Sequence, residues 1–431
     1  MAQQKLHGVA ADWLTDAKQH LWLPYTQMQT AADPLAAVAT EGVRIELADG
    51  RQLIDGIASW WTACHGYNHP HIRNAIIEQV TKMPHVMLGG LVNEPAARLA
   101  GRLARLAPGD LDHVFFSESG SVAVEIAMKM ALQYWINREQ KGRTKFVCFR
   151  DGYHGDTLGA MSVCDPDEGM HSLFRGALPE QYMADLPRNR EQRDALDGFL
   201  HSHRQEIAGM IVEPLVQGAG GMKFHDPEVL RDLRALCDRH GLLLILDEIM
   251  TGFGRTGTLF ACTQAEVIPD IMTLSKALTG GTLALAATLA STKIYQAFLG
   301  EDDAMALMHG PTYMGNALAC AAANASLDLF ESEPRLAQVA AIEAHLREAL
   351  APCAGMQGVV DVRVKGAIGV VQLQDMKARA WFKQRFVEEG VWLRPFGDIV
   401  YTTPPFTISA GELHQVTQAM VKTIGEWAAR R

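Results

Sequence analysis

The stretch Leu242–Gly257, LLLILDEIMTGFGRTG, decides the fold of this chain. Its first five residues are apolar, which predicts a strand buried on both faces, as in a parallel sheet. The strand ends at two acids, Asp247 and Glu248. Because ligands of open α/β sheets bind beyond the carboxyl ends of the strands, these acids are candidates for a site. They are either partners of a buried cation, such as a pyridinium N–H, or a partly solvated acid pair.

Apolar runs and segments of helical periodicity alternate on both sides of this stretch. Strands are predicted at His113–Phe116, Lys145–Phe149, Met210–Val212 and Ile271–Leu274, and helices at Val122–Trp135 and Pro227–His240. The alternation extends over about 220 residues, which predicts a mostly parallel sheet covered by helices on both faces.

The two ends of the chain have a different pattern. Val43–Leu47 followed by DGRQLID predicts a hairpin that turns at Asp49-Gly50. A strand-like run at Val362–Gln372, a helix near Lys377–Glu389 and a last helix after Ser409, with Glu412 completing a capping box, follow near the other end. At 431 residues the chain exceeds the size of one core. We therefore predict an α/β fold with a large domain at residues 71–328 and a smaller α+β domain assembled from residues 1–70 and 329–431.

Composition excludes several classes of function. The net charge of −10 argues against nucleic acid or an anionic membrane as the main partner. Seven cysteines, an odd number with no CxxC pair, argue against a disulfide scaffold and a zinc site. The N-terminal MAQQKLHGVAADWLTD lacks the apolar core of a signal peptide, and no apolar run reaches the ~18 residues of a membrane helix. We expect a cytoplasmic protein without a metal site.

Two more strand ends carry groups with chemical potential. Ser117–Ser121 is a small turn opening a helix, which is either a phosphate site or an ordinary N-cap. Lys276 follows the strand Ile271–Leu274 and is either a Schiff-base amine or a surface lysine. With Asp247, these groups supply a phosphate cradle, an amine and a carboxylate at one edge of a sheet. Pyridoxal 5′-phosphate (PLP) requires these protein groups.

The segment LDEIMTGFGRTG, with Lys276 in LSKALTGG 29 residues after Asp247, resembles the signature of the class III aminotransferases, which are PLP enzymes of fold type I. The resemblance extends from about Trp22 to the last helix. Finer likeness lies in WLPYTQM, SWWTACHGYNHP, FSESGSVAVEIAMKMALQYW, FRDGYHGDTLGAMSVCD, MHGPTYMGN and LRPFGDIVYTTPP. These stretches are similar to the branch of the family that serves biotin biosynthesis, moving the amino group of S-adenosylmethionine to 8-amino-7-oxononanoate.

The resemblance assigns a catalytic and cofactor-binding set. Lys276 would hold PLP through its amine and move the proton during transfer, and Asp247 would pair with the ring nitrogen. Gly120 and Ser121 would bind the phosphate. Tyr153 would stack on the ring and border the substrate.

The family resemblance also implies a homodimer with shared active sites. Pro311 and Thr312 would then reach the phosphate of the neighbouring subunit's cofactor, and Gly310 would lie near its substrate.

Substrate recognition is expected from residues outside the common signature. Trp60 would form an apolar wall, and Tyr25 would contact the acceptor and stack on the adenine of the donor. Arg394 would bind the acceptor's carboxylate, for which a guanidinium fork is well shaped. Trp61 would stand beside Trp60 or serve the core alone, and Tyr401 is a further candidate.

Three other residues are left with open roles. Arg255 and Asp156 are either loop ion-pair partners or, for Arg255, a group that admits the donor's carboxylate. Relatives that use glutamate often carry an acid where this chain has Ala219, which favours a donor of another shape. The alternatives are another class III ω-amino-acid aminotransferase or an aminomutase, lysine as donor, and a non-catalytic PLP-binding protein.

Overall fold

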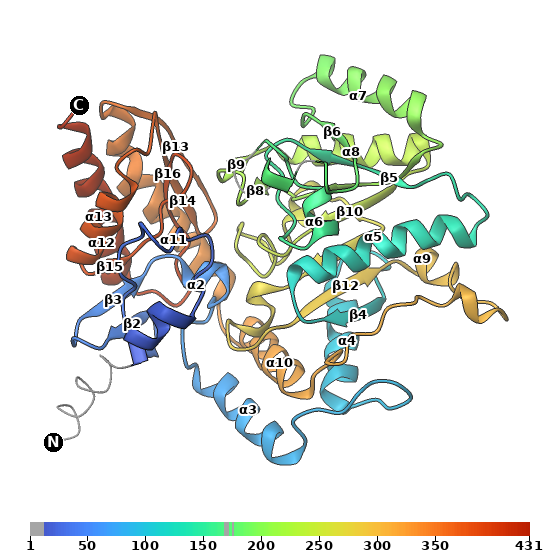
Figure 1. The fold of residues 1–431 in the computed structure, drawn as a ribbon, viewed down its shortest axis with the longest axis horizontal. Helices are drawn as coiled ribbons and strands as arrows, with labels where there is room; N and C mark the ends of the chain where they lie inside the picture. The colour runs from blue at the N-terminus through green and yellow to red at the C-terminus, as the bar shows by residue number, and fades with distance from the viewer. Residues whose placement is uncertain (1–12, 168–171, 175) are drawn as a thin grey trace.

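The computed structural model describes residues 13–167, 172–174 and 176–431. The chain forms two lobes, one built from the middle of the sequence and one that combines segments from the early and the late parts of the described chain (Figure 1). The sequence-based statements about residues 1–12 lie outside the described residues. Within the described part of the chain, no helix is long and apolar enough to cross a membrane.

The larger lobe contains a seven-stranded sheet in the order β4-β12-β11-β10-β7-β5-β6. Its strands are β4 (His113–Ser117), β5 (Lys145–Phe149), β6 (Tyr182–Ala184), β7 (Ile207–Val212), β10 (Leu243–Asp247), β11 (Ile271–Leu274) and β12 (Ala286–Ala290). Only β12 runs antiparallel to its neighbours. The mostly parallel sheet is confirmed, and β12 and β6 are additions that the sequence did not predict.

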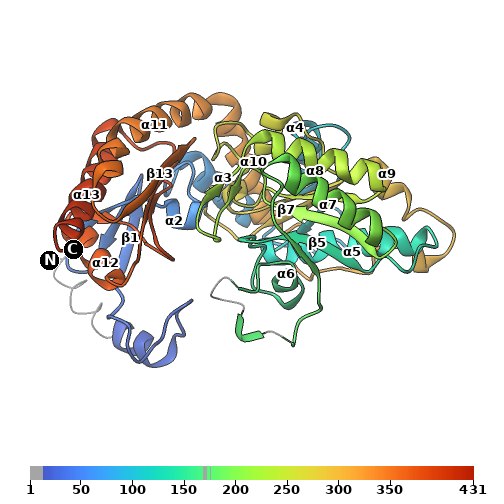
Figure 2. The same cartoon turned by 90° about the horizontal axis from the view of Figure 1, so that it is seen from above.

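The apolar run of β10 is explained by burial on both faces. Leu243 and Ile245 pack into the core beside α5, whereas Leu244 and Leu246 pack into the core beside α8. Figure 2 shows α5 and α8 on opposite sides of the sheet. The helices of this lobe are α3 (Pro70–Lys82), α4 (Glu94–Leu106), α5 (Gly120–Asn137), α6 (Leu158–Ser162), α7 (Arg190–His203), α8 (Pro227–His240), α9 (Thr292–Gln296) and α10 (Ala317–Ser332).

The smaller lobe joins both ends of the chain in one sheet. Strands β1 (Ala37–Glu41), β2 (Arg44–Leu47) and β3 (Gln52–Asp55) form a meander, and β15 (Val391–Trp392) adds parallel to β3. The predicted hairpin and the assembly of this α+β part from both termini are confirmed. The exact domain boundaries at residues 70 and 328 stay predictions.

A second sheet of the smaller lobe corrects one prediction. The run Val362–Gln372 is not one strand but a hairpin of β13 (Val359–Lys365) and β14 (Ile368–Leu373), which pairs on with β16 (Ile399–Thr402). The chain reverses at Gly366, whose φ is +53°. A Cβ atom added there would lie 2.5 Å from the carbonyl oxygen of Arg255. Only glycine suits such a close approach.

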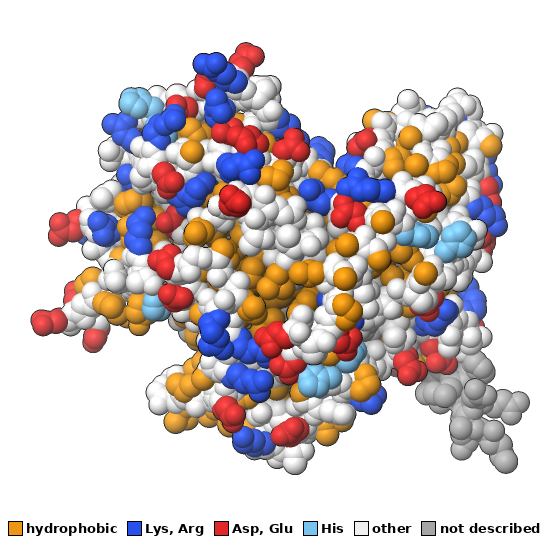
Figure 3. All heavy atoms as spheres, turned by 180° about the vertical axis from the view of Figure 1, so that it is seen from behind, with side chains coloured by type: hydrophobic (Ala, Val, Ile, Leu, Met, Phe, Trp, Pro, Cys, Tyr) orange, Lys and Arg blue, Asp and Glu red, His pale blue; other side chains and the backbone are white. Residues whose placement is uncertain are grey.

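Three helices complete the smaller lobe: α11 (Arg335–Leu350) packs on β13 and β14, whereas α12 (Arg379–Glu388) and α13 (Ala410–Ala428) pack on β15. The predicted capping box at the start of α13 is confirmed, since Ser409 and Glu412 cap each other's backbone N–H. On the face shown in Figure 3, hydrophobic side chains gather near the centre and charged side chains occupy the surroundings.

Candidate active site

A cavity of about 660 Å³ is lined by residues of both lobes, at the carboxyl ends of the parallel strands. Eight of the residues assigned from the sequence line it: Tyr25, Trp60, Gly120, Ser121, Tyr153, Asp247, Lys276 and Arg394. Trp61, Tyr401 and Ala219, which were open candidates, line it as well. The strand-end rule therefore locates the cavity correctly.

Lys276 follows β11 and extends its amine into the cavity. The Nζ atom lies 4.2 Å from the centroid of the Trp61 ring. Desolvation by burial lowers the pKa of the amine to about 8, although the charges of Asp247 and Glu213 oppose the shift. A surface position, the alternative that the sequence left open, is wrong. A lysine with a lowered pKa is a competent nucleophile and base near neutral pH.

Asp247 is the last residue of β10 and is buried at the cavity floor. His154 Nδ1 donates to its Oδ2 at 2.7 Å, and the backbone N–H of Ile249 donates to its Oδ1 at 3.1 Å. Burial is the largest single influence and disfavours a charged His154, but the hydrogen bond and charge of Asp247 and the charge of Glu213 together outweigh it and raise the pKa of the imidazole. The pair orients the carboxylate and keeps its charge compensated.

Glu213 and Glu248 are two further buried acids of this region. Glu213, which lines the cavity, accepts from the N–H groups of Tyr153 at 3.0 Å and Gly218 at 2.8 Å. Burial raises the pKa of Glu213 to about 7. Glu248 accepts from the Thr251 hydroxyl at 2.5 Å and from two backbone N–H groups. A partly solvated acid pair at Asp247-Glu248 is therefore wrong, because both are buried.

The N-terminus of α5 points at the cavity. Ser119 is the N-cap, and its hydroxyl accepts from the N–H of Val122 at 3.3 Å. The first N–H groups of a helix have no intrahelical partner, so those of Gly120 and Ser121 are available to an anion. A Cβ at Gly120 would lie 3.0 Å from Ile249 Cδ1, so a side chain here would fill space beside the helix end. These features fit a phosphate group.

Tyr153, Tyr25 and Asp156 form a hydrogen-bonded cluster above this helix end. The Tyr153 hydroxyl donates to Asp156 Oδ1 at 3.0 Å, and the Tyr25 hydroxyl donates to Asp156 Oδ2. Burial raises the pKa of Tyr25 to about 12, with Asp156 adding to the shift. The Asp156 N–H donates to Ser121 Oγ at 3.1 Å. Asp156 therefore orients cavity tyrosines.

A left-handed helical turn supplies both tryptophans. Ala58, Ser59, Trp60 and Trp61 have φ values of 46°, 48°, 59° and 71°. Each such residue costs about 1–2 kcal/mol, because Cβ approaches the following carbonyl oxygen. Neighbours on a helical turn point about 100° apart, so both rings can face one cavity. A core-only role for Trp61 is wrong, because it lines the cavity.

A group of cations lines the small-lobe side of the cavity. The Arg394 guanidinium stacks 4.4 Å from the centroid of the Trp60 ring. Arg379 and Lys383, both on α12, also line the cavity, although no role was predicted for either from the sequence. Burial lowers the pKa of Lys383, and the charges of Arg394 and Arg379 lower it further. Within the described residues, no carboxylate lies within 4 Å of these three cations, so the group is suited to an anionic ligand.

Two conspicuous residues lie outside the cavity. Arg255 is fully buried and donates to the carbonyl of Pro404 at 2.7 Å. Its role as a loop ion-pair partner is not supported, because among the described residues no carboxylate oxygen lies within 4 Å of its guanidinium, and its role in admitting a donor stays a prediction. His65 bonds Ser326 at 3.0 Å and Arg335 at 3.0 Å. Among the described residues, no three or more His, Cys, Asp or Glu side chains are grouped so that they could hold a metal ion.

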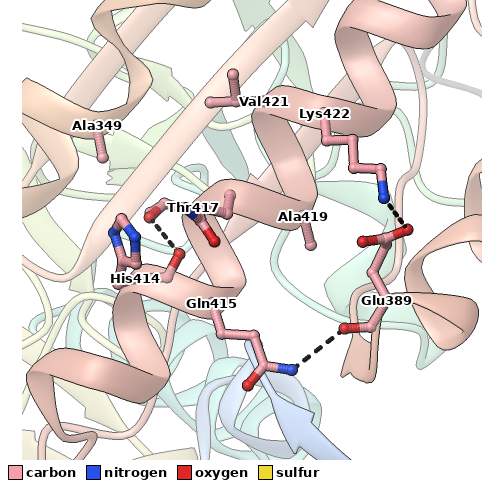
Figure 4. Close-up of a pocket in the computed structure, with 9 residues that line it drawn as sticks. Ala349, Glu389, His414, Gln415, Thr417, Ala419, Val421 and Lys422 are labelled. Atoms are coloured by element: carbon pink, nitrogen blue, oxygen red, sulfur yellow. Dashed lines mark hydrogen bonds and ion pairs between the residues drawn. The ribbon is translucent and has the colours of Figure 1, made fainter.

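Gly310, Pro311 and Thr312 do not line this chain's cavity. His85 donates to the carbonyl of Thr312 at 3.1 Å, on the outer side of the large lobe. A second hollow lies along α13 (Figure 4). Its Lys422 pairs with Glu389 at 2.8 Å. Its lysine is thus held in an ion pair on the protein surface, whereas Lys276 extends into the cavity at the end of a strand.

Residues 26–424 match the family of class-III aminotransferases, and the chain belongs to this family. It is therefore an enzyme that transfers amino groups. It is 48% identical over 415 residues to the adenosylmethionine-8-amino-7-oxononanoate aminotransferase of Mycobacterium leprae, covering 94% of this chain and 95% of that relative.

Solved structures show the same likeness. The crystal structure of adenosylmethionine-8-amino-7-oxononanoate aminotransferase from Methanocaldococcus jannaschii aligns with a TM-score of 0.92 at 35% identity, covering 96% of this chain and 98% of that chain. An amine transaminase from an uncultivated Pseudomonas species, solved in its PLP-bound form, aligns with a TM-score of 0.87 at 32% identity, covering 94% and 98%.

Proposed function

We propose that this chain uses PLP to transfer the α-amino group of S-adenosylmethionine to 8-amino-7-oxononanoate, giving 7,8-diaminononanoate for biotin biosynthesis. The names of the relatives support this reaction. The observation that carries it is the cavity itself, in which a Lys276 amine of lowered pKa faces Trp61 while Arg394 stacks on Trp60. One end suits amino transfer, and the other suits a long acceptor with a terminal carboxylate.

The cavity residues fit PLP. Gly120 and Ser121 would hold its phosphate at the start of α5, Asp247 would bind its ring nitrogen, and Lys276 would link to it. When bound, the cofactor supplies an electron sink for the substrate's α-carbon. Tyr153 would cover the ring and border the substrate.

Proton transfer belongs to Lys276. Its lowered pKa of about 8 leaves a substantial neutral fraction near neutral pH, which a base requires. His154 keeps Asp247 oriented through the 2.7 Å hydrogen bond. The reaction then proceeds by a ping-pong scheme, in which the donor leaves as a 2-oxo acid before the acceptor binds.

The cavity wall suits two substrates of different shape. Tyr25 and Trp60 meet edge to face, with ring centroids 6.2 Å apart, and can border an adenine or an alkyl chain. A sulfonium cation can lie over such a ring face. Arg394 would bind the acceptor's carboxylate. Ala219 at the cavity wall places no acid there, which is consistent with a donor other than glutamate.

A homodimer with shared sites is part of the proposal. The contact of His85 with Thr312 places two outer loops side by side, and Met87, Val92, Met308 and Tyr313 are exposed on them. Such apolar exposure is typical of a surface covered by a partner. Gly310, Pro311 and Thr312 would then complete the neighbour's site. A cytoplasmic location stays the sequence-based expectation.

A donor screen tests the reaction. Holoenzyme with 8-amino-7-oxononanoate receives S-adenosylmethionine, lysine, glutamate or alanine, and 7,8-diaminononanoate is quantified. We expect product with S-adenosylmethionine. Product formed with lysine and not with S-adenosylmethionine would show that lysine is the donor. If no donor gives product but the enzyme transfers amino groups between other amines and ketones, the result would support an ω-amino-acid aminotransferase.

A further inference from the structure

Asp55 lies beneath the left-handed turn of the cavity wall and is fully buried. Its Oδ1 accepts from the N–H of Ile57 at 2.9 Å, and its Oδ2 accepts from the N–H of Ser59 at 2.7 Å. The hydroxyl of Tyr67 donates to the same Oδ2 at 2.6 Å. One carboxylate therefore satisfies three donors: Ile57, which is the N-cap directly before the turn, Ser59 in the turn, and Tyr67.

The turn itself holds its strained backbone with helical hydrogen bonds. Trp61 N donates to Ile57 O at 2.9 Å, and Thr62 N donates to Ala58 O at 2.8 Å. Left-handed turns of several non-glycine residues are rare, and strained segments persist only where surrounding contacts over-determine them. Asp55 supplies such contacts at the start of the turn.

Asp55 also connects the turn to strand β15, which is followed two residues later by Arg394. Asp55 is in register with Trp392 of β15, and Gly56 N donates to the carbonyl of Trp392 at 3.1 Å. Arg394 follows two residues later and stacks on Trp60. A displacement of the turn at Asp55 would therefore separate Trp60 from Arg394 and move Trp61 away from Lys276.

We propose that Asp55, itself held by Tyr67, is a positioning residue for substrate recognition, which fixes the left-handed turn so that Trp60 and Trp61 form the cavity wall. This role rests on the proposed function, because the substrate affected first is the carboxylate-bearing acceptor at Trp60 and Arg394.

Asparagine cannot replace Asp55 in this role. Asparagine has one oxygen and one NH2 group, so in either orientation its amide nitrogen faces a backbone N–H, that of Ile57 or that of Ser59, which cannot accept. Asp55→Asn therefore releases the turn on one side. Tyr67→Phe removes only one donor and leaves both bonds to the turn, so its effect is smaller.

A double-mutant cycle distinguishes positioning from general stability. Asp55→Asn is expected to raise the acceptor's KM about tenfold with kcat changed less than about threefold, because misplacement of a binding wall acts on binding. In a Trp60→Ala background, Asp55→Asn should change KM by less than about twofold, since the residue acts through Trp60. Tyr67→Phe should raise KM about threefold, with the same loss of effect beside Trp60→Ala.

Asp270→Asn is the matched control, because Asp270 is a buried carboxylate that also accepts a backbone N–H, from Leu244 at 2.8 Å, outside the cavity. It should leave the acceptor's KM unchanged. An unchanged KM in Asp55→Asn, or effects of Asp55→Asn and Trp60→Ala that multiply, would overturn the proposal. If Asp55→Asn fails to fold, the Tyr67→Phe cycle decides by the same criteria.

Near-ultraviolet circular dichroism separates this proposal from the reaction. Asp55→Asn should change the tryptophan bands of the free protein, and the change should vanish when Trp60 and Trp61 are both replaced. Unchanged bands in Asp55→Asn would overturn the proposal even if the transfer reaction is confirmed. Absence of amino transfer to the acceptor in the unmodified enzyme would instead contradict the proposed function.

Discussion

The two walls of the cavity are built by different means. The large-lobe wall consists of groups at the ends of regular strands, such as Asp247 after β10 and Lys276 after β11. The small-lobe wall combines the left-handed turn at Trp60, the segment carrying Arg394 and the start of helix α12. A parallel sheet therefore positions the candidate reacting groups, whereas a strained turn, an irregular segment and one helix shape the substrate space.

The walls also differ in charge. The large-lobe wall, which is the floor of the cavity, holds the buried carboxylates of Asp247 and Glu213 beside the Lys276 amine. The opposite side holds three cations, on α12 and after β15. Changes on the floor should therefore reduce kcat, and changes on the opposite wall should act on KM.

Replacing Lys276 should have the largest effect. Lys276→Ala removes the amine that we propose links the cofactor and moves the proton, and proton transfer alone contributes roughly 10²–10⁴-fold to the rate. We expect kcat to fall by at least that factor while PLP still binds, measured by product formation and by cofactor titration. Lys293→Ala, at a lysine paired with Asp270 outside the cavity, should keep full activity. Retained activity in Lys276→Ala would sink the assignment.

Neutralising Asp247 should rank second. Asp247→Asn keeps the shape of the side chain. It removes the negative charge beside His154, which would also face the ring nitrogen of the cofactor. A fall in kcat of roughly 10²–10³-fold is expected, by analogy with loss of one preorganised electrostatic contact. Stopped-flow rates of each half-reaction check this, with Asp270→Asn as the control. Equal losses in both variants would indicate damage to the sheet instead.

The pKa of Lys276 gives a pH prediction of intermediate size. Burial lowers this pKa to about 8, so the neutral amine that attacks an aldehyde accumulates as pH rises toward 8, well below the range of an exposed lysine. The rate at which apoprotein combines with PLP should rise about tenfold per pH unit below 8 and level off above it. A rate still rising steeply at pH 9–10 would show an ordinary lysine.

The sequence predicted one wall far better than the other. Asp247, Lys276 and Gly120 follow from the rule that parallel strands present their carboxyl ends at one edge. Trp61 was left open because adjacent residues in a strand point to opposite faces, and the sequence does not reveal a left-handed turn of non-glycine residues. Arg379 and Lys383 were missed because, on a helix, they look like ordinary solvated side chains.

The cations on α12 should show the smallest effect. Arg379→Gln and Lys383→Gln together should raise the acceptor's KM several-fold, roughly the worth of partly exposed ion pairs, and leave kcat unchanged. The effect should shrink as salt is added, because these side chains are accessible to solvent. Steady-state kinetics at two ionic strengths measure it, and Lys377→Gln nearby is the control. A fall in kcat would contradict the assignment of Arg379 and Lys383 to substrate binding.

The half-reaction with the amino donor tests whether S-adenosylmethionine supplies the amino group. Holoenzyme is mixed with S-adenosylmethionine without acceptor, and the visible absorbance of the bound pyridoxal form is followed. We predict loss of that band with one donor consumed per site, and its return when 8-amino-7-oxononanoate is added. A spectrum that S-adenosylmethionine leaves unchanged, in enzyme that another amine bleaches, would contradict the proposed function.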